Sequence, residues 1–199
     1  MEFTQNQSVK TLAVLLLIAA ITQPIYTALY LGAPEVDRKF LWGIEALIFV
    51  LLAAFAGSAL VMAKQSTLGF SAFACSAGGN VGQVGSGLTQ FAPVGEAASV
   101  NADLEGVASS VVSVSFFGFN AAKVLLGLAA IVFGMGLMKD GRKLLGGVTA
   151  LFGTVAFVAN TIVMMFGLDG IVPPPVAGGT GVIATLLLSF CLFGYKTAD

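Results

Sequence analysis

Residues 40–63 read "FLWGIEALIFVLLAAFAGSALVMA", a run in which Glu45 is the only charged side chain. A helix needs about 20 consecutive apolar residues to cross the hydrocarbon core of a bilayer, so this run predicts a transmembrane helix. Comparable runs occupy 11–32, 124–138 with the Phe-rich residues before it, 144–167 and the shorter 181–195. The first of these runs is too long for the apolar core of a signal peptide, and we expect it to be a retained span. The sequence therefore predicts an all-α integral membrane protein with about five transmembrane helices.

The composition agrees with this class and excludes several others. Of the 199 residues, 57% are hydrophobic and 10% are charged, whereas an ordinary soluble domain carries roughly 25% charged residues. A net charge of −1 offers no basic surface for nucleic acid. The chain has no histidine and two distant cysteines, Cys75 and Cys191, which excludes His-ligated haem and Ser-His-Asp triads. We expect no cofactor, no metal site and no enzymatic activity.

A short motif occurs twice. Residues 38–47 read "RKFLWGIEAL" and residues 142–151 read "RKLLGGVTAL", with six of ten positions identical. Each copy follows a lysine and an apolar run, so each predicts a helix, a basic turn and a second helix. The pattern predicts two parallel helical hairpins, 10–63 and 123–167, followed by a last helix.

Parallel hairpins would place both Arg-Lys turns on one side of the membrane. That side would also hold Lys139 and Lys196, and by the positive-inside rule it would face the cytoplasm. We therefore expect the N-terminus outside, the C-terminus in the cytoplasm, and the protein in a bacterial inner membrane.

The segment 65–106 is rich in Gly, Ser, Asn and Gln. These residues argue against a lipid-exposed span, and we expect an external segment. Within it, Val81, Val84, Leu88 and Phe91 recur at helical spacing and predict an apolar docking stripe. The stripe packs either on the chain's own helices or on a partner, and the sequence leaves both alternatives open.

Two ionisable residues fall inside predicted spans, where charged groups are functional candidates. Helical rise separates Glu45 and Lys123 by more than about 10 Å along the membrane normal, so we expect no direct ion pair. Lys123 is expected to extend to the outer membrane surface. Glu45 is expected to pair with Arg38 or Arg142, and a proton- or cation-binding carboxylate is the alternative.

The predicted parts are a first hairpin, an external segment, a second hairpin, a Pro/Gly-rich external connection and a last helix, over 1–64, 65–106, 107–168, 169–180 and 181–199. The preferred function is a non-catalytic membrane subunit, structural or accessory, in a larger assembly. Its expected partners are the lipid bilayer and other membrane subunits or further copies of the chain. The alternative is a small transporter or channel whose path runs between the hairpins and uses Glu45 and Asn160.

Overall fold

The computed structural model describes residues 3–33, 36–167 and 170–197, and all regular structure in them is helical. Five of the helices are long and apolar enough to cross a membrane, which confirms the predicted class. The elements in chain order are α1 (Gln5–Gly32), α2 (Lys39–Val61), α3 (Thr67–Thr89), α4 (Val94–Val100), the 3₁₀ turn η1 (Ala102–Leu104), α5 (Glu105–Lys139), α6 (Lys143–Phe166) and α7 (Pro174–Gly194). The five candidate spans are α1, α2, α5, α6 and α7.

Local sequence explains several of the helix boundaries. Thr4 and Gln7 form a capping box that satisfies free backbone N–H groups at the start of α1. Prolines begin α7, where the missing N–H has no cost. Gly141 adopts φ of +88° in the turn between α5 and α6, a conformation that favours glycine.

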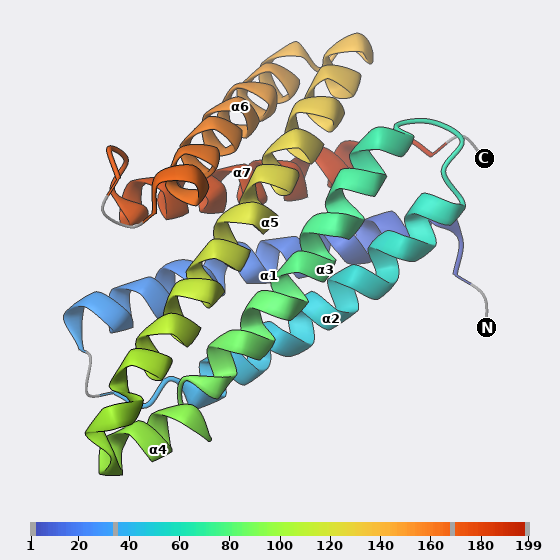
Figure 1. The fold of residues 1–199 in the computed structure, drawn as a ribbon. Coiled ribbons are helices and arrows are strands. Elements are labelled where there is room, and N and C mark those ends of the chain that lie inside the picture. Colours follow the sequence, from blue (N-terminus) through green and yellow to red (C-terminus); the bar gives the residue numbers. More distant parts are fainter. Residues whose placement is uncertain (1–2, 34–35, 168–169, 198–199) are drawn as a thin grey trace.

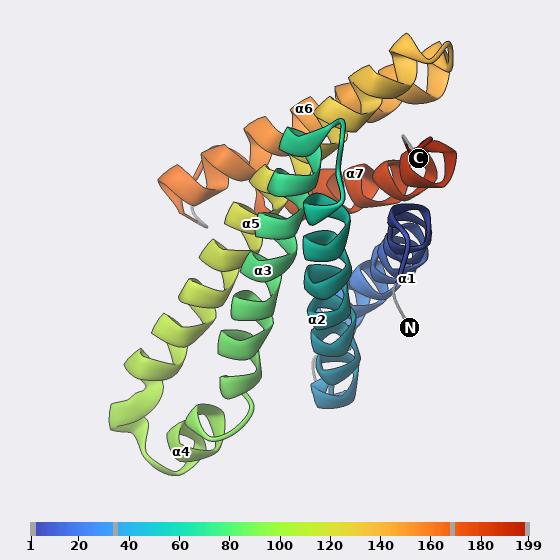
Figure 2. The same cartoon turned by 90° about the vertical axis from the view of Figure 1, so that its right-hand side faces the viewer.

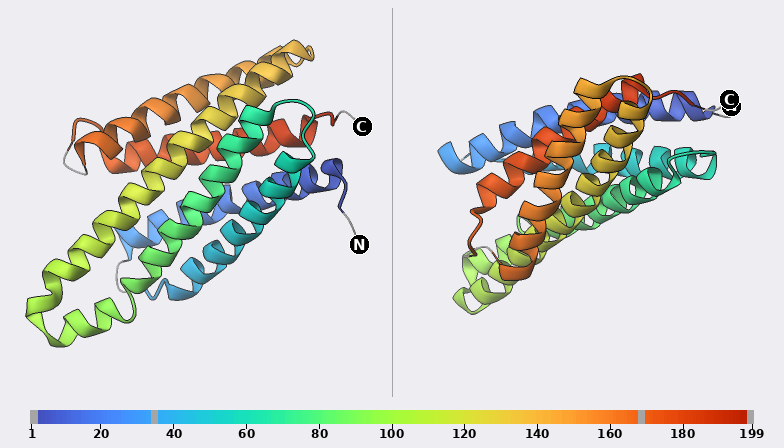
Figure 3. Two further views of the ribbon diagram at one scale, coloured as in Figure 1. Left: turned by 45° about the vertical axis from the view of Figure 1, so that its right-hand side comes forward. Right: turned by 90° about the horizontal axis from the view of Figure 1, so that it is seen from above.

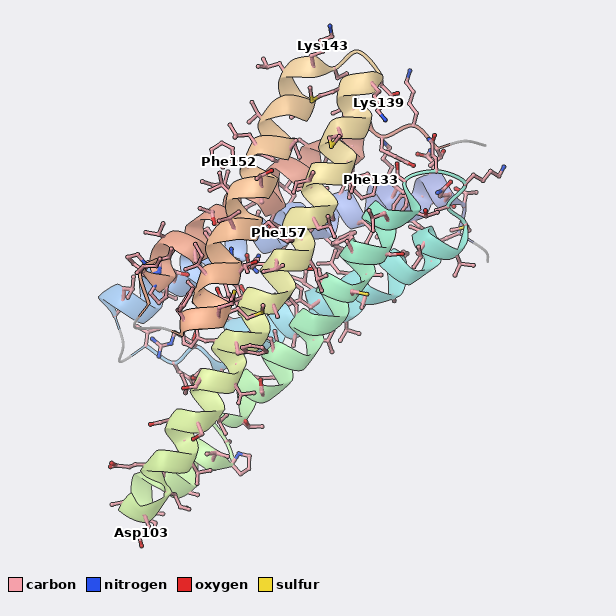
Figure 4. The ribbon with its side chains drawn as sticks, turned by 45° about the horizontal axis from the view of Figure 1, so that its top comes forward. Asp103, Phe133, Lys139, Lys143, Phe152 and Phe157 are labelled. Carbon is pink, nitrogen blue, oxygen red and sulfur yellow. The ribbon has the colours of Figure 1, made fainter. Side chains whose placement is uncertain are left out.

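The helices form an elongated bundle with two different ends (Figure 1). At one end, which we call the terminal end, α1 begins beside the last turn of α7, and the Lys10 ammonium donates to the Phe193 carbonyl. The turns between α2 and α3 and between α5 and α6 also lie at this end (Figure 3). At the other end, which we call the α4 end, Lys39 forms a 3.7 Å ion pair with Glu96 of α4. Figure 4 shows Asp103 and Lys139 at these opposite ends of α5.

Helix α3 packs between α2 and α5 at one side of the bundle (Figure 2). The sequence predicts an external segment over 65–106, and in the structure the first half of this segment is a helix that packs against the candidate spans. Nine residues of α3 are buried, among them Phe70, Phe73 and Val84. The glycines of this segment permit close packing, because a Cβ on Gly79 would lie 3.4 Å from the Cβ of Ala122. Only the second half, with α4 and η1, forms a cap at the α4 end.

The two Arg-Lys turns lie at opposite ends of the bundle, so the predicted parallel arrangement of the hairpins is wrong. Arg38 donates to the Leu29 carbonyl at the α4 end. Arg142 lies against Gly194 at the terminal end. The physical reason is α3, which returns the chain to the α4 end before α5 begins. For the same reason α1 begins and α7 ends at one end of the bundle (Figure 1).

Helices α5 and α6 touch through small residues. A Cβ on Gly146 would lie 2.5 Å from the Gly134 carbonyl oxygen, and a Cβ on Gly153 would lie 2.8 Å from that of Gly127. The two backbones are therefore in direct contact, as in small-residue packing of membrane helices. These glycines serve packing within one chain.

Candidate functional site

Lys123 is the most unusual side chain in the bundle, because it is charged and only 1% exposed. It lies near the middle of α5. Its Nζ donates to Gln23 Oε1 on α1 at 2.9 Å and to Thr185 Oγ1 on α7 at 3.1 Å. It also lies 5.2 Å from the ring centroid of Phe119, within cation–π range. The expectation that Lys123 extends to the membrane surface is therefore wrong.

Helix α7 is shaped to receive this lysine. A Cβ on Gly181 would lie 2.8 Å from Lys123 Cδ, so the absence of a side chain makes room for the lysine stem. One turn later, the Thr185 hydroxyl donates to the Gly181 carbonyl at 2.7 Å. Because its hydrogen is used there, the Thr185 oxygen can accept from the ammonium. Gln23 Oε1 and Thr185 Oγ1 thus both accept hydrogen bonds from Lys123 Nζ.

Glu45 lies near this lysine without touching it. The residue is 7% exposed, and Thr22 on α1 lies close to its carboxylate. Glu45 and Lys123 interact electrostatically, although the one ion pair within 4.0 Å among the described residues is elsewhere. Glu45 Oε1 is buried and has no hydrogen-bond partner in the described part of the chain.

The expected partners of Glu45 are not the observed ones. Arg142 lies at the terminal end beside Gly194, and Arg38 lies over the Tyr26 ring at the α4 end. Helical rise puts Arg38 about 10 Å along α2 from Glu45. The structure instead brings Glu45 toward Lys123, because the lysine side chain reaches from α5 to α1.

Four buried polar residues and the partly buried Thr22 form a group that we call the Lys123 cluster, where α1, α2, α5 and α7 converge: Thr22, Gln23, Glu45, Lys123 and Thr185. It combines a basic group, an acidic group and neutral donors and acceptors. Burial of a charge without a contacting counter-charge is costly unless hydrogen bonds compensate. The side chains of the Lys123 cluster can bind and release protons and can solvate a small ion.

Aromatic groups lie between the cluster and each end of the bundle. Toward the terminal end, the ring centroid of Phe133 lies 4.9 Å from that of Phe70 and 5.5 Å from that of Tyr195. Toward the α4 end, Trp42 lies 5.3 Å from Tyr26 and 6.2 Å from Phe91. We call these groups the terminal triad and the α4 triad. The Lys123 cluster is enclosed between them.

Asn160 is buried but is not part of the cluster. Its Nδ2 donates to the Ala156 carbonyl at 2.8 Å and to the Ala177 carbonyl on α7 at 3.2 Å. Ala177 precedes Thr185 by two turns of α7, or about 12 Å of helical rise. Asn160 therefore joins α6 to the start of α7, and the structure does not bring it together with Glu45.

The predicted docking stripe packs on the chain's own bundle. Val84 is 1% exposed, and Val81, Leu88 and Phe91 are partly buried against the main core. Phe91 belongs to the α4 triad through Trp42. The structure thus supports the first of the two alternatives left open by the sequence.

Sequence reasoning missed the role of Lys123 and its partners Gln23, Thr22 and Thr185. A usable signal was present, because Lys123 stands within a long helical run whose apolar part continues on both sides. The number of residues between Lys123 and Lys139 alone predicts a position for Lys123 near the outer membrane surface. Because α5 is long and crosses the bundle obliquely (Figure 1), the number of residues from Lys139 does not give the depth of Lys123.

No family model, no curated protein and no solved structure matches this chain. In the described ranges, no three His, Cys, Asp or Glu side chains lie together as a metal site requires. The Lys123 cluster is therefore the feature of the molecule from which a function can be inferred.

Proposed function

We propose that the chain is a small membrane transporter or channel for ions, with the Lys123 cluster on its path. The observation that carries this proposal is a 1%-exposed lysine held by neutral side chains from α1 and α7. Ionisable residues inside membrane bundles mark ion pathways and proton relays. A purely structural core gains little from such a group, because hydrophobic replacements of buried ion pairs are often neutral or stabilising.

The ion that best fits this chemistry is the proton. Lys123 and Glu45 both bind protons, and they lie close enough to interact while no direct ion pair fixes either charge. Thr22, Gln23 and Thr185 supply hydroxyl and amide groups that can relay hydrogen bonds around them. The proposal is therefore proton movement through the cluster, alone or coupled to a second solute.

The same proposal includes a sixth crossing by α3. Its 23 residues extend about 34 Å, enough for the hydrocarbon core. Its polar side chains bond within the protein: Ser76 donates to the Ala122 carbonyl, Asn80 to that of Ser76, and Gln83 to the Ser115 hydroxyl. Hydrogen bonds of this kind allow a polar helix to cross when neighbours cover it.

Charge indicates which end of the bundle faces the cytoplasm. The α4 end carries Arg38 and Lys39 together with the acids Asp37, Glu96, Asp103 and Glu105. The terminal end carries Lys10, Lys64, Lys139, Arg142, Lys143 and Lys196. By the positive-inside rule the terminal end lies in the cytoplasm, with both chain termini there. This orientation replaces the one that parallel hairpins predict.

Proton flux in liposomes tests the functional proposal. Purified protein is reconstituted with an entrapped pH-sensitive dye, and a potassium gradient with valinomycin imposes a membrane potential. We expect proton flux above that of empty liposomes, and we expect Lys123→Met to reduce it at least tenfold. Lys139→Met, the same change at an exposed position of the same helix, should retain the flux.

Two outcomes would reject proton transport through the cluster. One is wild-type flux no greater than that of empty liposomes, and the other is equal flux in wild type and Lys123→Met. The first outcome would favour the second candidate, a non-catalytic subunit of a membrane assembly. One observation supports that candidate: Gly78, Gly82 and Gly85 of α3 have nothing within 4 Å of an added Cβ, so another helix could approach closely there.

A further inference from the structure

The chain repeats itself in more than the Arg-Lys turn. Residues 14–21 of α1 read "VLLLIAAI" and residues 124–131 of α5 read "VLLGLAAI", with six of eight positions identical. The Arg-Lys motifs then open α2 and α6 in the same order. A match in two successive helices pairs α1 with α5 and α2 with α6, and chain order then pairs α3 with α7.

The paired helices run in opposite directions. Helix α1 runs from the terminal end to the α4 end, whereas α5 runs from the α4 end to the terminal end (Figure 1). The packing follows the same pairing: α1 contacts α7, and its counterpart α5 contacts α3. The halves α1–α3 and α5–α7 are thus arranged as inverted units.

Two buried serine bonds match across the halves. Ser76 of α3 donates to the Ala122 carbonyl of α5 at 2.7 Å. Ser189 of α7 donates to the Ala13 carbonyl of α1, also at 2.7 Å. In each case the third helix of one half bonds to the first helix of the other half. The aligned repeats place Ala122 within one residue of the position equivalent to Ala13.

We infer that the halves are inverted copies of one three-helix unit, and that the Lys123 cluster opens to the terminal end when one half moves against the other. This inference rests on the proposed function. Inverted repeats with a site at their interface are the usual basis of alternating access in membrane transporters. Here Gln23 and Glu45 come from the first half, and Lys123 and Thr185 come from the second.

Several of the contacts that such a movement must break lie at the terminal end. The terminal triad joins Phe70 of the first half to Phe133 and Tyr195 of the second. Beside it, Gln65 Nε2 donates to the Lys196 carbonyl at 2.9 Å. The α4 triad differs, because Tyr26 and Trp42 both belong to the first half and Phe91 directly follows α3. The terminal triad is therefore the gate between the halves.

A reversible tether tests this gate in the full chain. In a background with Cys75→Ser and Cys191→Ala, Gln65→Cys and Lys196→Cys are joined by a short, reducible bifunctional reagent. Both positions are exposed and lie across the gate. We expect the tether to lower proton flux at least tenfold and reduction to restore it. The control tether joins Lys139→Cys to Lys143→Cys within the second half, and it should leave flux unchanged.

Flux that persists with the gate tethered would overturn the inference while leaving the proposed function intact. If the untethered protein shows no proton flux, the proposed function fails. Distances between pairs of spin labels then test the gate independently of flux. Spin labels at Lys64 and Lys139 measure a distance between the two halves, whereas labels at Lys139 and Lys196 measure a distance within the second half. We expect two populations of distances for the first pair and one population for the second. A single population for both pairs would overturn the proposed gate.

Discussion

Gly146→Leu is expected to separate α6 from α5 and to lower the free energy of unfolding by about 3 kcal/mol or more. At this position a Cβ alone would lie 2.5 Å from the Gly134 carbonyl oxygen and 2.8 Å from the Met138 backbone nitrogen. Neither backbone atom can move without displacing a helix. Overpacking of a tight interface costs typically 1–3 kcal/mol, and more when backbone must shift. Titration with sodium dodecyl sulfate in micelles, followed by circular dichroism, measures the loss.

The matched control for this change is Gly136→Leu on the facing helix. A Cβ on Gly136 has nothing within 4 Å, so the same side chain finds space there. We expect a change below about 1 kcal/mol, in line with substitutions away from packed contacts. Equal destabilisation by both variants would show that helix–helix contact through Gly146 is not what holds α6.

Gln23→Leu is expected to destabilise the protein by about 1.5–3 kcal/mol, because it removes one of the two oxygen acceptors of the buried Lys123 ammonium. In a Lys123→Met background the same change should have almost no effect, since no charge then needs the amide oxygen. Lys123→Met alone should itself be destabilising, because it leaves the Gln23 and Thr185 acceptors and the buried Glu45 carboxylate without Lys123. Unfolding free energies of the four proteins in this double-mutant cycle give the coupling energy.

The size of the coupling decides whether the lysine is charged. Neutral hydrogen bonds between membrane helices average about 0.6 kcal/mol in such cycles, whereas bonds to charged groups are worth about 1.5–3 kcal/mol. A coupling above about 1 kcal/mol supports a protonated Lys123 in the resting state. Independent effects of Gln23→Leu and Lys123→Met would refute the hydrogen bond on which the cluster is built.

Hydropathy and length alone predict the five most apolar helices, because lipid selects long apolar runs. They do not predict that α3 packs against the spans, because its glycines and polar residues interrupt the apolar pattern and its polar side chains bond to neighbouring helices, as with Ser76 and the Ala122 carbonyl. One missed helix reverses the direction of everything that follows it. For that reason the repeated Arg-Lys motif is a real feature of the sequence, while the parallel hairpins inferred from it are wrong.

The candidate site was predictable only in part. Glu45 stands out as the single charge in its run, and the structure places it in the buried cluster. Gln23, Thr22 and Thr185 carry no such signal, because isolated polar residues are common in membrane helices. What joins them is the reach of Lys123 across the bundle, which depends on helix crossing and on the space left by Gly181.

The proposed path requires two halves that cross the membrane in opposite directions and enclose the Lys123 cluster. Labelling from one side of sealed vesicles tests this most directly, with single cysteines at Val36 and at Asp140 in a chain lacking Cys75 and Cys191. Both positions are exposed, and they lie beside the two Arg-Lys turns. We predict that an impermeant maleimide labels Val36→Cys from outside and labels Asp140→Cys only after the vesicles are opened or inverted. Labelling of both positions from the same side would contradict the inverted arrangement, and with it the path proposed through Lys123.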